Sequence, residues 1–551
     1  MPYGSGTCPV LRRRTLTALL AGSLFSPACL PTPPAATSAA VPATATATAT
    51  AWLNLLHYRP NGNGHHRSDV PDGHFFVSAT GRDDPQAELQ ASLDRLHGPP
   101  ADARRFACAF PARTRWLEAQ SGLTATPGSR DCPELARWKA EIGARGVTLL
   151  FASAYMGSPS SMFGHTLLRF DSDRPALLSY AVNFAARVPA EDSLSYPFKG
   201  LTGRYTGQFS VLPYYQKLRE YQHLEQRAMW EYRLPLTAAQ TETLVDHIWE
   251  LKNVSFPYYF LDENCGSRML DVLGVIEPYA RLAHASSPVV VPQDVFKTVV
   301  AEGAERGTVH LVSPRAELIA AADAGIAAPH AGHASRQIEI GAGRATRGRD
   351  HADAVSFTLA GGYHNLLDPA DGYPPGAGID FFRLGLRGAR GSLRVESADL
   401  VDIQSLQTPA GDGWSPVWRA GLGLSRRHVP HSLVHDALSL QSHFGAGFGR
   451  QVGPVMIHGL LELRLAGTPH SATLGLGPRL GFAYQGRSGI ALTGAASRQT
   501  FVDGGRTVDS MEIAAGLPLD RDHTLVGQLL QTRGDGFPAV RSLMLGLRRY
   551  F

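Results

Sequence analysis

The sequence predicts a chain of several domains: a mostly helical N-terminal segment, an α+β domain in the middle, and a C-terminal antiparallel β-barrel of about 12 strands. Three observations support this prediction. The 551 residues exceed one ordinary domain. The chain opens with a basic and then apolar stretch that is followed by a low-complexity tract. After about residue 333 the apolar pattern changes to a two-residue period.

Residues 1–40 have the layout of an export signal and the start of a disordered tract. The basic run Arg12–Arg14 precedes the apolar stretch from Leu16 to Phe25, which is too short to span a bilayer as a helix. The residues after the arginines fit general secretion better than the twin-arginine route. Cys29 leaves lipid attachment open as an alternative, in a poor sequence context. The Ala/Thr/Pro tract from Pro31 to Ala51 is predicted to be disordered.

The cysteines support an exported chain. Cys8 and Cys29 lie in or beside the signal, whereas Cys108 and Cys132 lie in one polar, helical region. An oxidising compartment would join the latter two in a disulfide. Cys265 is then left over, and a free thiol in an exported protein suggests a chemical role.

Residues 50–140 are predicted to be mostly helical, since Ala87–Leu96 and Glu134–Ile142 carry apolar residues at helical spacing. Four histidines gather near a loop rich in Gly, Pro and Asn, and none has the spacing on a helix that favours a metal site. We therefore expect solvated loop histidines and no metal; the four are His57, His65, His66 and His74.

Residues 141–320 alternate strands and helices. Apolar runs predict three strands and two helices, one of which has Thr237 and Gln240 as a capping box and a buried stripe. The strands are Val147–Tyr155, His165–Phe170 and Leu177–Phe184, and the helices run from Ala238 to about Lys252 and from Cys265 to Leu273, where Gly274 ends the second.

Cys265 and His165 form the candidate chemical pair. Cys265 would begin a helix, whose N-terminal N–H groups and partial positive charge favour a thiolate. His165 would open a core strand and serve as the base. The N–H groups of Cys265 and Gly266 are the expected oxyanion donors.

A third side chain should orient the His165 ring. If Asp171–Pro175 is a hairpin turn, antiparallel pairing brings Asn183 opposite or next to His165 on one face of the sheet. A slip of one residue would turn Asn183 away and make Ser179 or Asp171 the candidate instead.

Residues 333–551 predict the barrel, after a linker at about 320–335 that is rich in Ala, Gly and His. Apolar residues and glycines alternate with polar ones, as at Glu462 and Arg464, in about 12 segments of roughly ten residues. A soluble β-sandwich also alternates and is the competing prediction. Aromatic residues near segment ends would form interfacial girdles: Tyr363, Trp414, Trp418, Tyr484 and Phe501.

The composition gives little support to nucleic-acid binding, because the net charge of +4 is spread along the chain and no basic run is interleaved with aromatics. We expect no cofactor. The expected location is the outer membrane, with the N-terminal domain in the periplasm.

The segments Ser161–Phe170 and Glu263-Asn264-Cys265 resemble the bacterial family called the Lnb N-terminal periplasmic domain, over roughly residues 50–320. The C-terminal region resembles the barrel-like part that commonly follows this domain. More distantly, the order His first and then Asn-Cys is similar to circularly permuted NlpC/P60-like papain enzymes.

That resemblance implies a permuted papain-like fold in which Cys265 is the nucleophile and His165 its base, with Asn183 loosely at the third position. It also implies a hydrolase or acyltransferase acting on amides of peptidoglycan peptides or on acyl lipids, and the sequence does not choose between these substrates. The competing hypothesis is a non-catalytic barrel for transport or anchoring, with a ligand-binding periplasmic domain.

Overall fold

The computed structural model describes residues 43–551, so the predicted export signal, Cys8 and Cys29 lie outside the described residues. Within that range it leaves out 63, 122–130, 157–160, 190–195, 226, 283–288, 311–327, 390, 407–412, 427–437, 469–470, 487–488, 503 and 536. In the described part, no helix combines the length and the apolar composition needed to cross a membrane.

The N-terminal segment is built from five helices and a short hairpin of β1 (Tyr58–Pro60) and β2 (His66–Ser68). The helices are α1 (Ala43–Leu55), α2 (Pro85–Leu96), α3 (Pro100–Ala109), α4 (Pro111–Ser121) and α5 (Pro133–Ile142). Four of these helices begin with proline, whose fixed φ and missing N–H suit the first helical position. A disulfide between Cys108 and Cys132 joins α3 to the residue before α5, which confirms the predicted pairing.

One of the four loop histidines differs from expectation. His57 is 2% exposed, and its Nε2 lies 3.2 Å from Nε2 of His247 in α8 (Ala238–Leu251). Burial lowers the pKa of His57 well below its usual value, so the ring is neutral. The prediction of a solvated His57 was wrong, because a helix nearly 200 residues away in sequence covers it.

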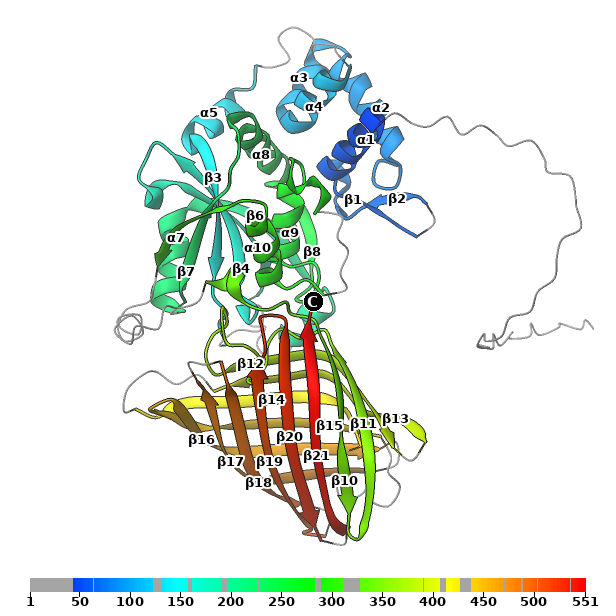
Figure 1. The fold of residues 1–551 in the computed structure, drawn as a ribbon. Coiled ribbons are helices and arrows are strands. Elements are labelled where there is room, and N and C mark those ends of the chain that lie inside the picture. Colours follow the sequence, from blue (N-terminus) through cyan, green and yellow to red (C-terminus); the bar gives the residue numbers. More distant parts are fainter. Residues whose placement is uncertain are drawn as a thin grey trace, which may run out of the picture. The chain divides into compact units, whose positions relative to one another are not determined.

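The middle domain contains an antiparallel sheet in the order β8-β6-β5-β4-β3-β7-β9 (Figure 1). Its strands are β3 (Ala144–Ala152), β4 (His165–Ser172), β5 (Tyr180–Arg187), β6 (Tyr205–Pro213), β7 (Met229–Arg233), β8 (Ser255–Tyr258) and β9 (Glu305–His310). Helices α8, α9 (Cys265–Leu273) and α10 (Pro292–Ala301) pack on β3, β4 and β5, and α6 (Tyr196–Leu201) and α7 (Tyr214–Arg219) are shorter. The sheet and these helices enclose the main apolar core.

The local predictions for this domain hold with small shifts. α8 carries the predicted capping box of Thr237 and Gln240, and α9 has the predicted bounds with Gly274 as its C-cap. β3 begins and ends three residues earlier than predicted. β5 begins later, because Ala176–Leu178 form a 3-10 turn before it.

The C-terminal region is a closed barrel in which each strand pairs with the next and β10 pairs with β21 (Figure 1). Its 12 strands confirm the predicted barrel and exclude the two-sheet sandwich. They are β10 (Gln337–Arg347), β11 (Asp350–Ala360), β12 (Ala377–Ala389), β13 (Ser392–Ser405), β14 (Ser415–Ser425), β15 (Ser439–Val452), β16 (Val455–Thr468), β17 (Ser471–Gln485), β18 (Ala491–Phe501), β19 (Thr507–Pro518), β20 (His523–Gly534) and β21 (Phe537–Tyr550).

The alternation along each strand separates an apolar exterior from a polar interior. In β16, Leu461 and Leu463 are 59% and 42% exposed, whereas Glu462 between them is 0% exposed. Leucines also face outward along β21, at Leu543 and Leu545. An apolar exterior around buried charges is the arrangement of a barrel that sits in lipid.

The predicted aromatic girdle is only partly present. Trp414 is 58% exposed, but Tyr363 and Phe501 are 2% and 1% exposed and Trp418 is partly buried against an internal cluster. The two-residue period does not show which face an aromatic at a strand end occupies, and Tyr363 follows β11 rather than belonging to it. Phe444 and Phe448 of β15 are aromatic residues that do face outward.

Candidate active site

His165 stands at the first position of β4, directly after a glycine that the backbone requires. Gly164 has φ of +83°, and a Cβ there would lie 2.3 Å from the Phe151 ring. The chain can therefore turn tightly into β4 against β3, where Ala152 pairs with His165. The His165 side chain is 8% exposed and held by the strand.

Asn183 of β5 fixes the orientation and tautomer of His165. The imidazole Nε2 lies 2.7 Å from Asn183 Oδ1, and the Asn183 amide nitrogen donates to Ser210 Oγ at 3.4 Å. An amide oxygen only accepts, so Nε2–H is the donor. Nδ1 of the neutral ring is then the basic nitrogen. The structure thus brings together the two residues that the predicted hairpin placed on one face.

Ser179 and Asp171, the alternatives to Asn183, lie elsewhere in the hydrogen-bond network. Ser179 Oγ accepts from the Ser172 backbone N–H at 3.3 Å, and Asp171 bonds Arg169 and Thr148 at the far end of β4. Neither contacts His165. β4 and β5 pair Leu168 with Val182, and this register leaves Asn183 and His165 on the same face of the sheet.

Cys265 is the first residue of α9, and Asn264 caps this helix. Asn264 Oδ1 accepts from the Gly266 N–H at 2.9 Å, and Ser267 Oγ accepts from the Asn264 N–H in return. Asn264 also donates to Val290 O at 2.7 Å, which ties the helix start to the segment before α10. The local sequence thus holds Cys265 rigidly at a helix N-terminus.

The start of α9 adjoins the start of β4. The backbone N–H of Thr166, the residue after His165, lies close enough to the Cys265 sulfur to lower the pKa of its thiol, and α9 packs on β4 and β5. The Thr166 hydroxyl donates to Pro292 O at 3.3 Å and so anchors β4 to α10. Residues 100 positions apart in the sequence therefore share one site.

Burial sets the charge state of this site. Cys265 is 1% exposed, and burial raises the pKa of its thiol to about 11 although the N–H groups of Thr166 and Gly266 and the charge of Arg227 oppose that shift. Burial likewise lowers the pKa of His165 to about 3. At neutral pH the resting pair is a thiol and a neutral imidazole. The expected thiolate stabilisation by the helix N-terminus is present but is outweighed by burial.

The predicted oxyanion donor Gly266 already has a partner. Its N–H donates to Asn264 Oδ1 while also lying near the sulfur, so an oxyanion at this position would have to compete with the cap. The role of Gly266 remains a prediction. The N–H of Cys265 itself also faces the sulfur and is the second candidate.

Two residues next to the pair carry no recognisable sequence signal. Tyr221 lies in a π-helical turn (Glu220–Leu224) after α7, with its ring 5.8 Å from that of His165. Arg227 is 1% exposed, donates to the backbone of Ala152 and Ser153, and stacks on Tyr221 at 4.8 Å. Arg227 opposes the rise in the Cys265 pKa and places a positive charge beside the site, where it also pairs with Glu225 at 2.7 Å.

An apolar cluster borders the site on the side of the His165 motif. Phe163, two residues before His165, packs against Tyr363 and Phe381 with ring centroids 5.6 and 5.2 Å apart. Gln293 of α10 accepts from the Tyr363 hydroxyl at 2.5 Å and donates to Pro329 O. The motif of β4 thus contacts residues that follow β11 and begin β12.

One group of side chains has the composition of a metal site, and it does not include Cys265 or His165. His333, His364 and Asp368 bring their ligand atoms within 4.8 Å of one another. Hydrogen bonds already engage these atoms: His333 contacts Ala334 O through Nδ1 and His364 through Nε2, and Asp368 accepts from Tyr550. These side chains therefore take part in one hydrogen-bond network.

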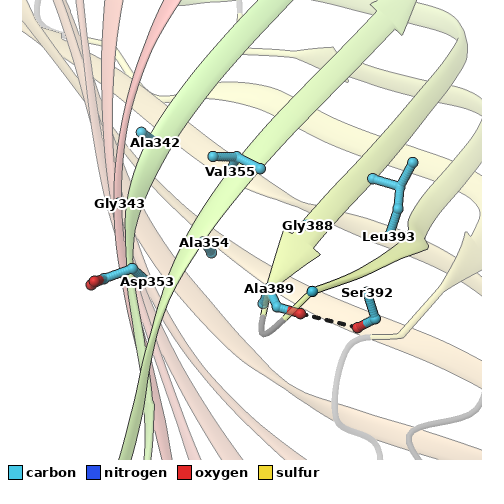
Figure 2. Close-up of a pocket in the computed structure, with 10 residues that line it drawn as sticks. Ala342, Gly343, Asp353, Ala354, Val355, Gly388, Ala389, Ser392 and Leu393 are labelled. Carbon is cyan, nitrogen blue, oxygen red and sulfur yellow. Dashed lines mark hydrogen bonds between the residues drawn. The ribbon is translucent and has the colours of Figure 1, made fainter.

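A hollow of about 680 Å³ lies among β10, β11, β12 and β13 (Figure 2). Small side chains such as Ala342, Ala354 and Ala389 line it, and Asp353 is the ionisable residue among the described residues that line it. Its Ser392 hydroxyl donates to Ala389 O at 3.0 Å. The described residues that line it do not include the paired groups that catalysis needs.

Residues 134–302 match the family model of the Lnb N-terminal periplasmic domain. Residues 45–120 and 327–550 match two families described as domains of unknown function, DUF7843 and DUF7840. The comparison with curated proteins finds no match.

Among solved structures, the chain is similar to an outer membrane channel from Pseudomonas putida F1, with 12% identity, a TM-score of 0.28, and coverage of 40% of this chain and 96% of that one. It is also similar to the NanC porin, at 9% identity, a TM-score of 0.26, and 39% and 99% coverage. LpxR from Salmonella typhimurium gives 7% identity, a TM-score of 0.23, and 39% and 100% coverage.

Because these TM-scores are low, the assignment of a membrane barrel depends on the strand pairing and the apolar exterior of this chain itself. Together with the periplasmic-domain match of residues 134–302, these features place the chain in the outer membrane, with its N-terminal domain in the periplasm, as predicted. The protein is an outer-membrane β-barrel that carries a periplasmic domain.

Proposed function

We propose that the periplasmic domain is a thiol hydrolase or acyltransferase that acts on amide or ester bonds of cell-envelope material. The observation that carries the proposal is the hydrogen bond from His165 Nε2 to Asn183, which makes Nδ1 the base while the Cys265 sulfur lies against the next residue of the same strand. A nucleophile, a base and an orienting amide are the parts of a papain-like site.

In the proposed reaction, His165 Nδ1 takes the thiol proton as the Cys265 sulfur attacks the carbonyl carbon of the substrate. The tetrahedral oxyanion collapses and expels an amine or alcohol, which receives the proton from His165, and a thioester remains. Water or a second amine or alcohol then attacks the thioester, with His165 accepting its proton and returning it to the sulfur. The fixed charge of Arg227 would stabilise the anionic stages.

The alternative is a non-catalytic periplasmic domain that binds peptidoglycan or lipid and is anchored by the barrel. The neutral state of the buried pair favours this alternative, since a thiol with a pKa of about 11 is a poor nucleophile at neutral pH. Under the catalytic proposal, substrate entry must change this environment and bring the sulfur and the base into proton-transfer contact.

The experiment is a product screen of the purified full-length protein in detergent, offered muropeptides in one arm and phospholipids in another. Mass spectrometry would detect cleaved or transferred products. The proposal predicts products in one arm that disappear in Cys265→Ala and His165→Ala. Unchanged substrates with the wild-type protein in both arms, together with saturable binding of either one, would support the ligand-binding alternative.

A further inference from the structure

The connection between β11 and β12, residues 361–376, lies at the end of the barrel where the C-terminus also lies. Gln337, the first residue of β10, pairs with Ala360 at the end of β11 and with Tyr550 at the end of β21. We call residues 361–376 the mouth loop. The mouth loop and the start of β10 lie at the same end of the barrel. This end faces the periplasm, because the periplasmic domain precedes β10 in the chain.

Leu366 of the mouth loop belongs to a buried cluster with residues of barrel strands that are not neighbours of β11 or β12. Leu366 is 4% exposed and packs in one cluster with Val417 of β14, Met456 and Leu460 of β16, and Ala483 of β17. In the ring of 12 strands β17 is five positions from β12, and six would be directly opposite. A loop that joins β11 to β12 and shares a buried cluster with β14, β16 and β17 extends into the lumen.

The backbone of the mouth loop touches the wall again at β19. A Cβ on Gly516 would lie 2.1 Å from the carbonyl oxygen of Leu367, so only glycine allows the approach seen here. Gly516 belongs to β19, which lies on the other side of the ring from β14. The loop therefore contacts the inner wall on two sides.

A buried ion pair fixes the loop to the last strand. Asp368 is 1% exposed, contacts the Arg548 guanidinium of β21, and accepts from the Tyr550 hydroxyl at 2.7 Å. Arg548 also contacts Glu339 of β10 at 2.8 Å. Removing one partner of such a pair leaves an uncompensated buried charge, which is strongly destabilising.

Charged side chains also lie inside the barrel, close in sequence to the strand residues that pack with Leu366. Glu462 of β16 is fully buried and contacts Arg464 at 3.0 Å and Arg419 of β14 at 3.4 Å. Complete burial of a carboxylate that points into a barrel means that neighbouring side chains exclude water from it.

We propose that the mouth loop is a plug that closes the periplasmic opening, so that the barrel anchors the protein and is not a diffusion channel. The contacts of Leu366, Leu367 and Asp368 with strands on three parts of the ring carry the inference. The proposal concerns the barrel alone and stands whether or not Cys265 is catalytic.

The test is ion current through planar lipid bilayers that contain the purified full-length protein. The wild-type protein should give the baseline of a protein-free bilayer. A variant in which residues 365–372 are replaced by an equally long Gly/Ser run should give stepwise currents. The matched control is Pro454→Ser, which changes the turn between β15 and β16 at the same rim of the barrel. This variant should give no current.

Heat-modifiable migration in mild detergent checks that each variant retains a folded barrel. Stepwise currents from the wild-type protein would overturn the proposal, and so would a folded but silent Gly/Ser variant. If that variant does not fold, the double substitution Leu366→Ser with Asp368→Asn keeps the backbone and should give brief openings. Silence of that folded double variant would equally overturn the proposal.

Discussion

The imidazole Nε2 of His165 lies 2.7 Å from the side-chain oxygen of Asn183, across neighbouring strands of one sheet. Because the Asn183 amide nitrogen donates to Ser210, its oxygen is the atom that faces the ring. The contact sets the protonated nitrogen of His165 and leaves Nδ1 basic. The catalytic proposal depends on this relationship, and the first prediction tests it.

Asn183→Ala should reduce acyl transfer from a generic ester such as p-nitrophenyl butyrate by about 100-fold, because the His165 ring loses its orientation. Release of p-nitrophenol would measure the rate. Ser210→Ala is the matched control: Ser210 contacts Asn183 at 3.4 Å and not His165, so a much smaller loss is expected. Equal rates in wild-type and Asn183→Ala protein would exclude an orienting role.

The pH dependence of thiol alkylation tests the charge state of the resting site. With burial raising the pKa of Cys265 from 9.0 to about 11, iodoacetamide should label it at pH 7 about 100-fold more slowly than an exposed thiol. The rate should then rise about tenfold with each pH unit up to the thiol pKa. Peptide mass spectrometry would follow the labelling. A rate that levels off below pH 8 would instead indicate a thiolate–imidazolium pair.

The disulfide between Cys108 and Cys132 closes a loop with a sequence separation of 24. Replacing both cysteines by serine should lower the free energy of unfolding of the periplasmic domain by about 3 kcal/mol, because the unfolded chain regains conformational freedom. Trp249 donates to Cys108 O at 2.8 Å, so its fluorescence can report the transition. A reductant should destabilise the wild-type protein and leave the double variant unchanged.

The energetic cost of an arginine on the lipid-facing surface should depend on its depth in the bilayer. Leu461→Arg, in the middle of β16, should destabilise the barrel in vesicles by about 2–4 kcal/mol, whereas Val452→Arg, at the end of β15, should cost at most about 1 kcal/mol. Both positions are exposed, at 59% and 52%, so they differ mainly in depth. Urea titration of vesicle-folded protein measures the difference. Equal costs would mean that Leu461 does not face lipid.

Much of the fold was predictable because its signals are local. α8 and α9 begin where the sequence places them, with the predicted cap at Thr237, and the alternation around Glu462 survives as a buried and exposed pattern. The strand order of the middle sheet was not predictable, since β8, β6 and β5 become neighbours through tertiary packing alone. The same reason explains why His57 and Phe501 are buried.

The candidate site was predictable to the extent that its residues lie in motifs or in one hairpin. His165 and Asn183 meet because a short turn joins their strands, and Cys265 begins a well-capped helix. Tyr221 reaches the site from a π-helical turn that follows no sequence period, and Arg227 reaches it from the segment after that turn. The pKa values of Cys265 and His165 depend on burial by the whole domain, which motif spacing does not encode.

The most direct measurement of the central claim is the mass of the intact protein after brief incubation with p-nitrophenyl butyrate and acid quenching, followed by peptide mapping. The proposed mechanism predicts one butyryl group on Cys265, which is absent in Cys265→Ala and strongly reduced in His165→Ala. An unmodified Cys265 in folded wild-type protein that binds muropeptides or phospholipids, or equal labelling of the wild-type and His165→Ala proteins, would contradict a Cys265–His165 catalytic pair.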